Sequence, residues 1–218
     1  MKLSSETITI LQNFAKLNSG IQFKKGNVLR TMSSGKNVLA KAVLKDSFPQ
    51  DFCVYDLNQF LLSYNLIKDT ELNFDDKNIY FQSSDGRSKT KYRKTYPEMI
   101  VVPPEKELKL NSVDVKFTLS GDDFDEIIKS SSMLQSPHIC VESEGDKIKL
   151  SAFNAEDDSA HIHSIEVAEG DGKKYKMVFL TQNLRMLPGS YDVEISFNGL
   201  ALFTNKNQEI QYWITTEI

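Results

Sequence analysis

Residues 4–20 read SSETITILQNFAKLNSG, and this segment decides the fold because its pattern begins again at residue 120. Ser4 is a candidate helix N-cap, since a serine side chain can accept a hydrogen bond from a free amide of the first turn. Apolar residues then recur at spacings of three and four: Ile8, Leu11, Phe14 with Ala15, and Leu17. This spacing predicts an amphipathic helix that ends near residues 19–20.

Residues 120–134, SGDDFDEIIKSSSML, repeat this plan with Ser120 as the cap, 116 residues after Ser4. Strand-like runs follow each helix in the same order. The first half predicts strands at 21–24, 28–32, 37–44 and 52–55, a short helix capped by Asp56, and strands at 71–74, 79–82 and 87–96. The second half predicts strands at 115–119, 139–142, 147–153, 160–167 and 175–180, a short helix at 181–187, and strands at 191–197, 201–204 and 210–216. We interpret this order as an internal repeat of topology.

The segment from Tyr96 to Val113 separates the two copies. It contains three prolines and the apolar run MIVV at 99–102. Proline lacks a backbone donor and fixes φ, so this segment is expected to be an extended connector. We predict a first domain at 1–104, whose connector spans about 97–113, and a second domain at 105–218.

Composition limits the class of protein. With 40% hydrophobic and 26% charged residues, the chain is typical of a soluble globular protein, and no apolar run approaches the ~18 residues of a membrane span. No secretion signal is apparent, and Cys53 and Cys140 are too few for a disulfide framework, which favours a reducing cytosol. Residues 1–104 carry a net charge of +5 and residues 105–218 a net charge of −9. This asymmetry suggests a basic partner surface, or two unlike faces that meet each other.

Catalytic and metal motifs are absent from the sequence. There is no GxSxG, GxxxxGK[ST] or HExxH, so we expect no enzyme and no cofactor. His138 and Cys140 share one strand face, and His161 and His163 share another. The strand at 147–153 is expected to lie between these pairs, about 9–10 Å apart, too far for one zinc site.

Three stretches and the connector resemble the sliding clamps of T-even-type bacteriophages. They are MKLSSETITILQNFAKLNSGI at 1–21, VYDLNQFL at 54–61, NLRMLPGSYDVEI at 183–195, and IVVPP at 100–104. The resemblance implies an α+β fold of two similar clamp-type domains, each with an antiparallel sheet outside and two helices facing the ring hole. It implies a homotrimeric ring that encircles double-stranded DNA without sequence specificity and tethers the replicative DNA polymerase. Further implied partners are a clamp loader and the transcription machinery, in the cytoplasm of the infected host cell and without a membrane.

Candidate site residues follow from this resemblance and from charge. A clamp that moves along DNA needs a mildly positive inner wall without tight phosphate contacts. Five residues are expected to face DNA: Asn13, Lys16, Lys68, Lys129 and Arg185. The alternative is that these are solvated helix faces.

Two charged segments are candidates for the subunit interface. Four basic residues alternate along one predicted strand and would share one face: Arg87, Lys89, Lys91 and Arg93. Acidic residues surround another predicted strand: Glu156, Asp157, Asp158 and Glu166. A basic and an acidic edge on one chain suit a head-to-tail joint. The alternative is an edge strand that charge protects from aggregation.

The connector is the candidate partner-peptide pocket, with Ile100, Val101, Val102 and Pro103 on one wall and Tyr212 and Trp213 on the other. Aromatic anchors are favoured at such sites. Alternation would turn Ile100 and Val102 one way, and Met99 and Val101 the other. The run could instead only pack the connector onto the domains.

Two other functions compete with the clamp. One is a duplicated β-rich structural protein of a virion, which would have no need of lysines on helix faces. The other is a hydrolase with an unrecognised acid pair, although Asp122 and Asp123 are typical of a helix start.

Overall fold

The computed structural model describes residues 1–217 and divides into two compact units, residues 1–105 and 106–218. The division lies one residue from the boundary expected from the connector. No helix within the described residues is long and apolar enough to span a membrane. Each unit is described by itself below.

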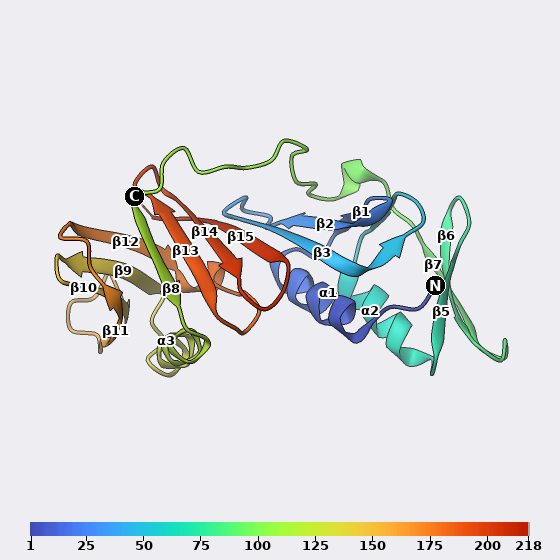
Figure 1. The fold of residues 1–218 in the computed structure, drawn as a ribbon. Helices are drawn as coiled ribbons and strands as arrows, with labels where there is room; N and C mark the ends of the chain where they lie inside the picture. The colour runs from blue at the N-terminus through green and yellow to red at the C-terminus, as the bar shows by residue number, and fades with distance from the viewer. Residues whose placement is uncertain (218) are drawn as a thin grey trace. The chain divides into compact units, whose positions relative to one another are not determined.

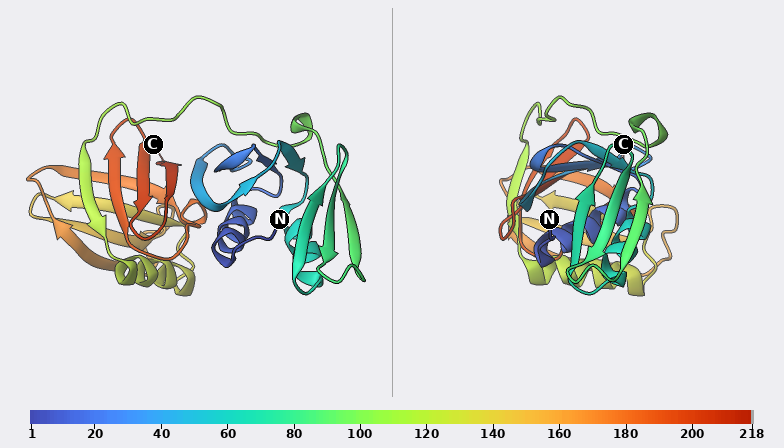
Figure 2. Two further views of the ribbon diagram at one scale, coloured as in Figure 1. Left: turned by 45° about the vertical axis from the view of Figure 1, so that its right-hand side comes forward. Right: turned by 90° about the vertical axis from the view of Figure 1, so that its right-hand side faces the viewer.

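The first unit contains two helices and two antiparallel sheets (Figure 1). Its elements are α1 (Ser5–Leu17), β1 (Ile21–Phe23), β2 (Gly26–Met32), β3 (Val38–Phe48), β4 (Phe52–Val54), α2 (Leu57–Leu66), β5 (Thr70–Phe74), β6 (Asn78–Ser83), β7 (Lys89–Arg93) and the 3-10 turn η1 (Pro97–Met99). The strand orders are β4-β1-β2-β3 and β5-β6-β7. Helix α1 packs beside α2 and against β3 (Figure 2).

The second unit contains one α-helix, one 3-10 turn and eight strands in its described part. Its elements are β8 (Val115–Leu119), α3 (Gly121–Met133), β9 (His138–Glu144), β10 (Lys147–Phe153), β11 (His163–Glu169), β12 (Lys174–Leu180), η2 (Thr181–Asn183), β13 (Tyr191–Ser196), β14 (Leu200–Asn205) and β15 (Ile210–Thr215). Strands β11-β10-β9-β12 form one antiparallel sheet, and β8, β13, β14 and β15 pair in the order β8-β13-β14-β15.

The strand orders confirm that the second unit repeats the plan of the first. The order β4-β1-β2-β3 corresponds to β12-β9-β10-β11, and β5-β6-β7 corresponds to β13-β14-β15. Even the extra strand has a counterpart: β8 pairs with β13, and Met1 exchanges two backbone hydrogen bonds of 2.7 Å with Leu72 of β5. The repeat therefore extends to the segment that precedes each long helix, which forms a strand in the second unit and a single pair of backbone hydrogen bonds in the first.

Aromatic clusters fill both cores. In the first unit Phe23 stacks on Phe52 with ring centroids 4.5 Å apart, and Phe60 meets Phe81 edge-on at 5.1 Å. In the second unit the fully buried Tyr191 meets Phe124 of α3 at 5.6 Å. Offset and edge-on pairs of this kind add to the free energy gained from burial alone.

The predicted helix at 181–187 is wrong, because only the three-residue turn η2 forms there. Residues 184–187 run without helix to Pro188, and Leu184, Met186 and Leu187 are buried. Proline disfavours helical conformation in the residue before it, and a segment this short gains too few hydrogen bonds to offset nucleation. The second unit therefore has one α-helix where the first has two.

Candidate functional site

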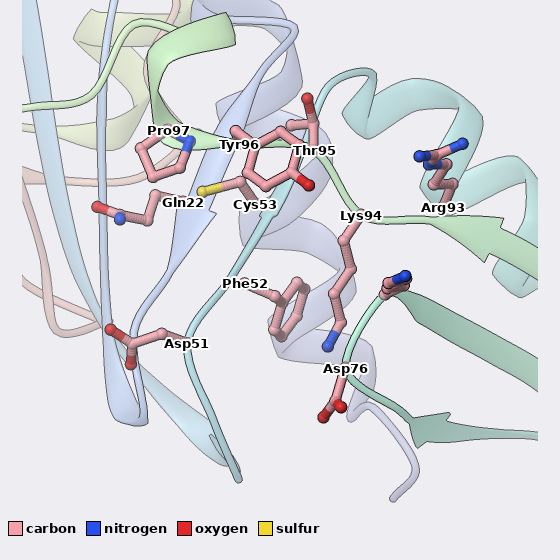
Figure 3. A pocket seen from close by; sticks show the side chains of 11 residues that line it. Gln22, Asp51, Phe52, Cys53, Asp76, Arg93, Lys94, Thr95, Tyr96 and Pro97 are labelled. Atoms are coloured by element: carbon pink, nitrogen blue, oxygen red, sulfur yellow. The ribbon is translucent and has the colours of Figure 1, made fainter.

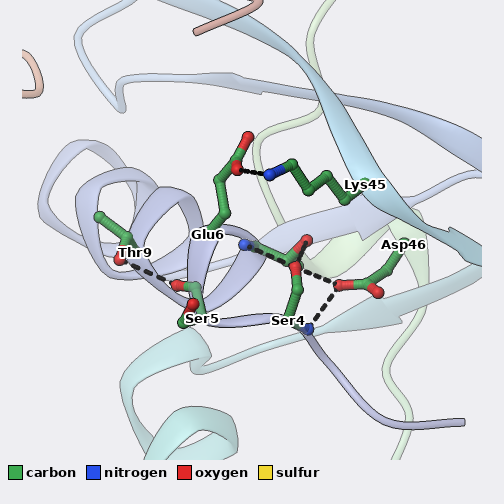
Figure 4. A network of polar contacts seen from close by, with 7 residues as sticks. Ser4, Ser5, Glu6, Thr9, Lys45 and Asp46 are labelled. Atoms are coloured by element: carbon green, nitrogen blue, oxygen red, sulfur yellow. Dashed lines mark hydrogen bonds and ion pairs between the residues drawn. The ribbon is translucent and has the colours of Figure 1, made fainter. Parts of the chain in front are cut away.

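The start of α1 is fixed to β3 by a carboxylate (Figure 4). Asp46 Oδ2 accepts hydrogen bonds from the Ser4 backbone amide at 2.7 Å and from Ser4 Oγ at 2.8 Å. Ser4 Oγ in turn accepts from the Thr7 amide, so Ser4 is the predicted N-cap. Partial burial would raise the pKa of Asp46, but hydrogen bonds from Ser4 and Thr7 outweigh it and lower this pKa. The helix face is thereby held in a defined orientation on its unit.

Lys16 is exposed on α1 as expected, but Asn13 is not. Asn13 is only 4% exposed, so the prediction that it faces DNA is wrong. The buried stripe of α1 runs through Ile10 and Leu17, and position 13 lies between them at spacings of three and four. The predicted apolar face is centred too far toward Ile8, which is only half-buried.

The other three candidates for DNA contact are exposed but differ in setting. Lys68 follows the end of α2. Lys129 lies on α3 with its Nζ 3.3 Å from Asp125 Oδ2. Arg185 was expected on a helix and instead lies in the irregular segment after η2. Only Lys16 and Lys129 therefore extend from helix faces.

Strand β7 forms a basic edge, because it is the terminal strand of β5-β6-β7. Lys89, Lys91 and Arg93 are exposed on it, whereas Tyr92 is buried, as strand alternation predicts. Arg87 does not share this face, since it lies in the turn before the strand. We call Lys89, Lys91 and Arg93 the basic edge.

Strand β11 forms an acidic edge at the end of the other unit's sheet β11-β10-β9-β12. Glu166 is exposed on the strand. The strand begins at His163, three residues later than the predicted start at residue 160. The preceding loop exposes Glu156, Asp157 and Asp158. The Ser159 hydroxyl and amide donate to Asp157 and lower its pKa. These four residues, Glu156, Asp157, Asp158 and Glu166, are the acidic edge below.

Exposed apolar side chains on α2, on α3 and just before β11 were missed in the sequence. On α2, Leu62 is 71% and Leu66 75% exposed, and α2 contacts β7 through Tyr92, whose hydroxyl donates to the Asp56 carbonyl at 2.9 Å. Near β11, Met133 of α3 is 77% and Ile162 is 63% exposed. The i, i+4 spacing of Leu62 and Leu66, off the buried face of α2, was the available signal.

The first half of the connector is attached to the first unit. Ile100 packs so closely on Gly20 that a Cβ there would lie 2.5 Å from Ile100 Cγ2. Asn18 Nδ2 donates to the Val101 carbonyl at 3.2 Å, and Arg30 Nη1 donates to the Glu105 carbonyl at 3.1 Å. Val101, Val102 and Pro103 remain half-exposed. Ile100 therefore packs the connector onto the first unit, which is the alternative that the sequence left open for residues 99–102.

Tyr212 and Trp213 do not form an exposed wall. Tyr212 is 0% exposed, accepts a hydrogen bond from the Leu187 amide at 3.2 Å, and has a pKa raised by burial. Trp213 and Ile214 are buried as well, so both faces of β15 are covered. The prediction that Tyr212 and Trp213 form a wall of the peptide pocket is wrong, because both side chains are buried.

A pocket of about 420 Å³ lies in the first unit where the connector begins (Figure 3). Phe52, Tyr96 and Pro97 supply its apolar lining. Lys94 crosses the Phe52 ring, with Nζ 6.0 Å from the ring centroid, and donates to the Asp75 carbonyl. Its charged lining is mixed: Asp51, Asp76, Lys77, Arg93 and Lys94. No single sign of ligand charge is favoured there.

Strand β10 separates the histidine and cysteine pairs as expected. Ser151 of β10 pairs with Cys140 on one side, and Ala152 pairs with His163 on the other. Burial raises the pKa of Cys140 to about 12. His163 Nε2 lies 3.0 Å from Glu126 Oε1. Within residues 1–217 no group of three or more His, Cys, Asp or Glu side chains is arranged to hold a metal ion.

Comparison with known proteins assigns each unit to a described family. Residues 3–102 match the family described as DNA polymerase processivity factor, and residues 116–218 match gp45 sliding clamp, C terminal. The sliding clamp of Vibrio phage KVP40 is 34% identical over 222 residues, covering 100% of this chain and 99% of that protein. The sliding clamp of Escherichia phage RB69 is 31% identical, covering 88% and 86%, and that of Enterobacteria phage T4 is 28% identical, covering 91% and 89%.

The fold has a solved relative in a eukaryote. The crystal structure of proliferating cellular nuclear antigen from Entamoeba histolytica matches with a TM-score of 0.72, covering 100% of this chain and 97% of that one. At 11% identity this likeness concerns the fold alone. The phage relatives extend over both units and nearly their own full length. The chain therefore belongs to the sliding clamps of T-even-type bacteriophages, a family of DNA polymerase processivity factors.

Proposed function

We propose that three copies of this chain close head to tail into a ring around duplex DNA and hold the replicative polymerase on its template. The observation that carries this proposal is the match of both units, in order, to processivity-factor families. The family acts by topology rather than catalysis, so the chain needs no reactive group. The ring works with a clamp loader and with the transcription machinery in the cytoplasm of the infected host cell.

The joint between copies unites the basic edge of one with the acidic edge of the next. Because the two edges lie on different units, the contact is heterologous and can close into a ring. Exposed ion pairs contribute only about 0–1 kcal/mol each and are screened by salt. Their main effect is to select the register and the partner.

The exposed apolar side chains supply most of the association energy in this joint. Leu62 and Leu66 are exposed on α2, whose first turn is joined to β7 through Tyr92, while Met133 lies on α3, which packs on β11, and Ile162 directly precedes β11. Complete burial of such a side chain is worth about 1.5–3 kcal/mol. Four of them therefore outweigh the ion pairs around them. The edges and the apolar residues together form one interface with an apolar centre and a charged rim, as stable interfaces have.

The polymerase dock is proposed along the connector, at Val101, Val102 and Pro103, which stay half-exposed while Ile100 anchors them. A short apolar tail peptide suits this extended apolar strip. Changing Val102 to Ser should lower the affinity for a polymerase tail peptide without altering oligomer mass. The same loss from Tyr96→Ala instead would place the dock in the pocket of Figure 3.

The ring itself is tested by mass and by retention on DNA. A solution mass near three times 24.8 kDa is expected. Once loaded, the protein should stay on closed circular duplex through a high-salt wash and leave when one cut linearises the circle. A stable monomer, or loss from circles and linear DNA at equal rates, would favour the structural virion protein instead.

A further inference from the structure

Asn18 ends helix α1 with a side chain that is almost completely buried. It is the C-cap residue of the helix, and its backbone amide donates to the Phe14 carbonyl at 3.0 Å. The residue is only 8% exposed, in the short loop between α1 and β1. A buried side-chain amide needs partners for both of its N–H groups and for its oxygen, because unpaired buried polar groups are costly.

The side-chain amide of Asn18 finds these partners in three different segments. Nδ2 donates to the Met32 carbonyl at the end of β2 at 3.0 Å and to the Val101 carbonyl of the connector at 3.2 Å. Oδ1 accepts from the Gly20 amide at 3.1 Å. This set fixes the orientation of the group, because exchanging Oδ1 and Nδ2 would place an oxygen against two carbonyl oxygens. One side chain thus joins the end of α1, the end of β2 and the connector.

The hydrogen bond to Val101 controls the direction of the half-exposed strip proposed as the dock. The Val101 carbonyl belongs to the planar peptide unit that joins Val101 to Val102, so holding this oxygen sets the orientation of the whole unit. Before it, Ile100 is extended, with φ −137° and ψ 162°, and packs on Gly20. After it, Pro103 has a fixed φ and restricts Val102 to extended conformations. The hydrogen bond therefore fixes the part of the strip that its two neighbours leave free.

We infer that Asn18 is a positioning residue of the partner dock: it holds the strip of Val101, Val102 and Pro103 in the conformation that a partner peptide meets. The inference rests on the proposed function, which places the polymerase tail on this strip. Asn18 is buried and reaches the strip through a backbone carbonyl, so it acts on the partner without contacting it. Without this bond, binding must also order the strip, and the affinity falls by the cost of that ordering.

The test removes the two donors of Asn18 and keeps a local acceptor. In Asn18→Ser the hydroxyl can still accept from the amide two residues later, but it is too short to reach two carbonyls of separate segments. Asn18→Asp keeps the size and the accepting oxygen and also loses the donors; it is measured at about pH 8 to keep the carboxyl ionised. The matched control is Asn205→Ser, since Asn205 is 6% exposed and accepts from the amides of residues 207 and 208 in the second unit.

Three measurements are made on each assembled ring. Fluorescence anisotropy with a synthetic polymerase tail peptide gives the affinity, and sedimentation gives the ring mass. NMR relaxation of the Ile100 and Val101 methyl groups gives the mobility of the strip. Both Asn18 variants should bind the peptide about tenfold more weakly than the parent, with a more mobile strip and an unchanged ring mass. Asn205→Ser should change the affinity by less than about twofold, because it is remote from the strip.

Gly20→Ala displaces the same strip by a different route. The added Cβ would lie 2.5 Å from Ile100 Cγ2 and 2.9 Å from Ile100 Cβ, so the strip must shift. If both changes act by releasing the strip, their losses should not add: the double variant Asn18→Ser, Gly20→Ala should bind within about twofold of the weaker single variant. A merely structural role of Asn18 predicts independent, additive losses, and full additivity would overturn the inference.

Val102→Ser separates failure of this inference from failure of the proposed function. It alters the strip directly and leaves the hydrogen bonds of Asn18 in place. If Val102→Ser weakens peptide binding and both Asn18 variants bind as tightly as the parent, the dock stands and the positioning role is wrong. If Val102→Ser itself binds as tightly as the parent, the proposed dock is rejected, and the role of Asn18 is rejected with it.

Discussion

The starts of α1 and α3 occupy equivalent places in the two units, yet different groups hold them. In the first unit a carboxylate from β3, Asp46, accepts from both the amide and the hydroxyl of the N-cap Ser4. In the second unit the neutral Ser190 hydroxyl accepts from the Gly121 amide at 3.0 Å, and the cap Ser120 bonds to Asp123 of its own helix. A repeated backbone plan thus fixes where a helix begins but leaves the chemistry of attachment free to diverge.

The largest effect on trimer stability should come from the exposed apolar side chains that each unit contributes to the joint. Changing Leu62 and Leu66 together to Ser should convert the trimer to monomer at micromolar concentration, because two side chains lose about 1.5–3 kcal/mol each on association. Sedimentation measures the mass. Met133→Ser on the other unit should weaken the trimer in the same direction, by roughly tenfold or more.

Met99→Ser is the matched control, since Met99 is an equally exposed apolar residue on η1. A trimer that survives both leucine changes, or that Met99→Ser disrupts as strongly, would place the joint elsewhere.

The charged rim should matter less than its apolar centre. Reversing Lys89 and Lys91 to Glu should weaken the trimer by about tenfold at low salt, because each would then face an acidic edge. The parent trimer should also weaken as salt rises, since the exposed pairs are screened. Sedimentation at two salt concentrations measures both effects. If the reversed variant associates as tightly as the parent, the edges do not meet.

The two helix starts should respond unequally to loss of their anchors. Asp46→Asn should cost α1 about 1–2 kcal/mol, because the amide oxygen of asparagine can accept the two hydrogen bonds but lacks the negative charge that strengthens them. Ser190→Ala should cost α3 about 0.5–1 kcal/mol, since one neutral hydrogen bond is lost. Amide hydrogen exchange in the first turn of each helix measures both. Equal losses would mean that the carboxylate adds nothing beyond a hydroxyl.

Lowering the pH should reduce the stability of the α1 start more than that of the α3 start, and this effect should be smaller than that of the substitutions. The pKa of Asp46 is lower folded than unfolded, so its contribution to stability is complete above the unfolded pKa of about 4. That contribution is lost as pH falls through the lower, folded pKa. Exchange protection of the α1 start should decline over this range in the parent but not in Asp46→Asn. A parallel decline in both proteins would exclude Asp46 as its cause.

Local signals made most of the fold predictable. The caps Ser4, Asp56 and Ser120 were read correctly because capping depends on the residue and its next three neighbours. The order of the strands followed from turn residues and alternation. The prediction of a helix at 181–187 was wrong although its residues have adequate helix propensity. Tertiary packing together with Pro188 decided the conformation of this segment.

The site was predicted less well, since it depends on which faces are covered. Asn13 is polar yet buried, and Tyr212 is an aromatic residue of a strand covered on both sides. Neither fact can be read from residue type alone. Leu62 and Leu66 are the opposite case, because apolar residues on a helix are usually assigned to the core. The exposure of Lys89, Lys91 and Arg93 was predictable because alternating charge along a strand indicates a solvent-facing side without tertiary information.

The placement of the basic and acidic edges on different units gives the proposed ring a direction. Three head-to-tail copies share a rotation axis but no twofold axis, so the two flat sides of the ring cannot be equivalent. The three connectors are then related by that axis, so all of them present the same surface to a given side of the ring. Proteins that recognise the connector would meet the same surface at every copy. A clamp of this construction therefore moves along DNA with a leading and a trailing side, and its orientation when loaded determines where the polymerase stands relative to the growing strand.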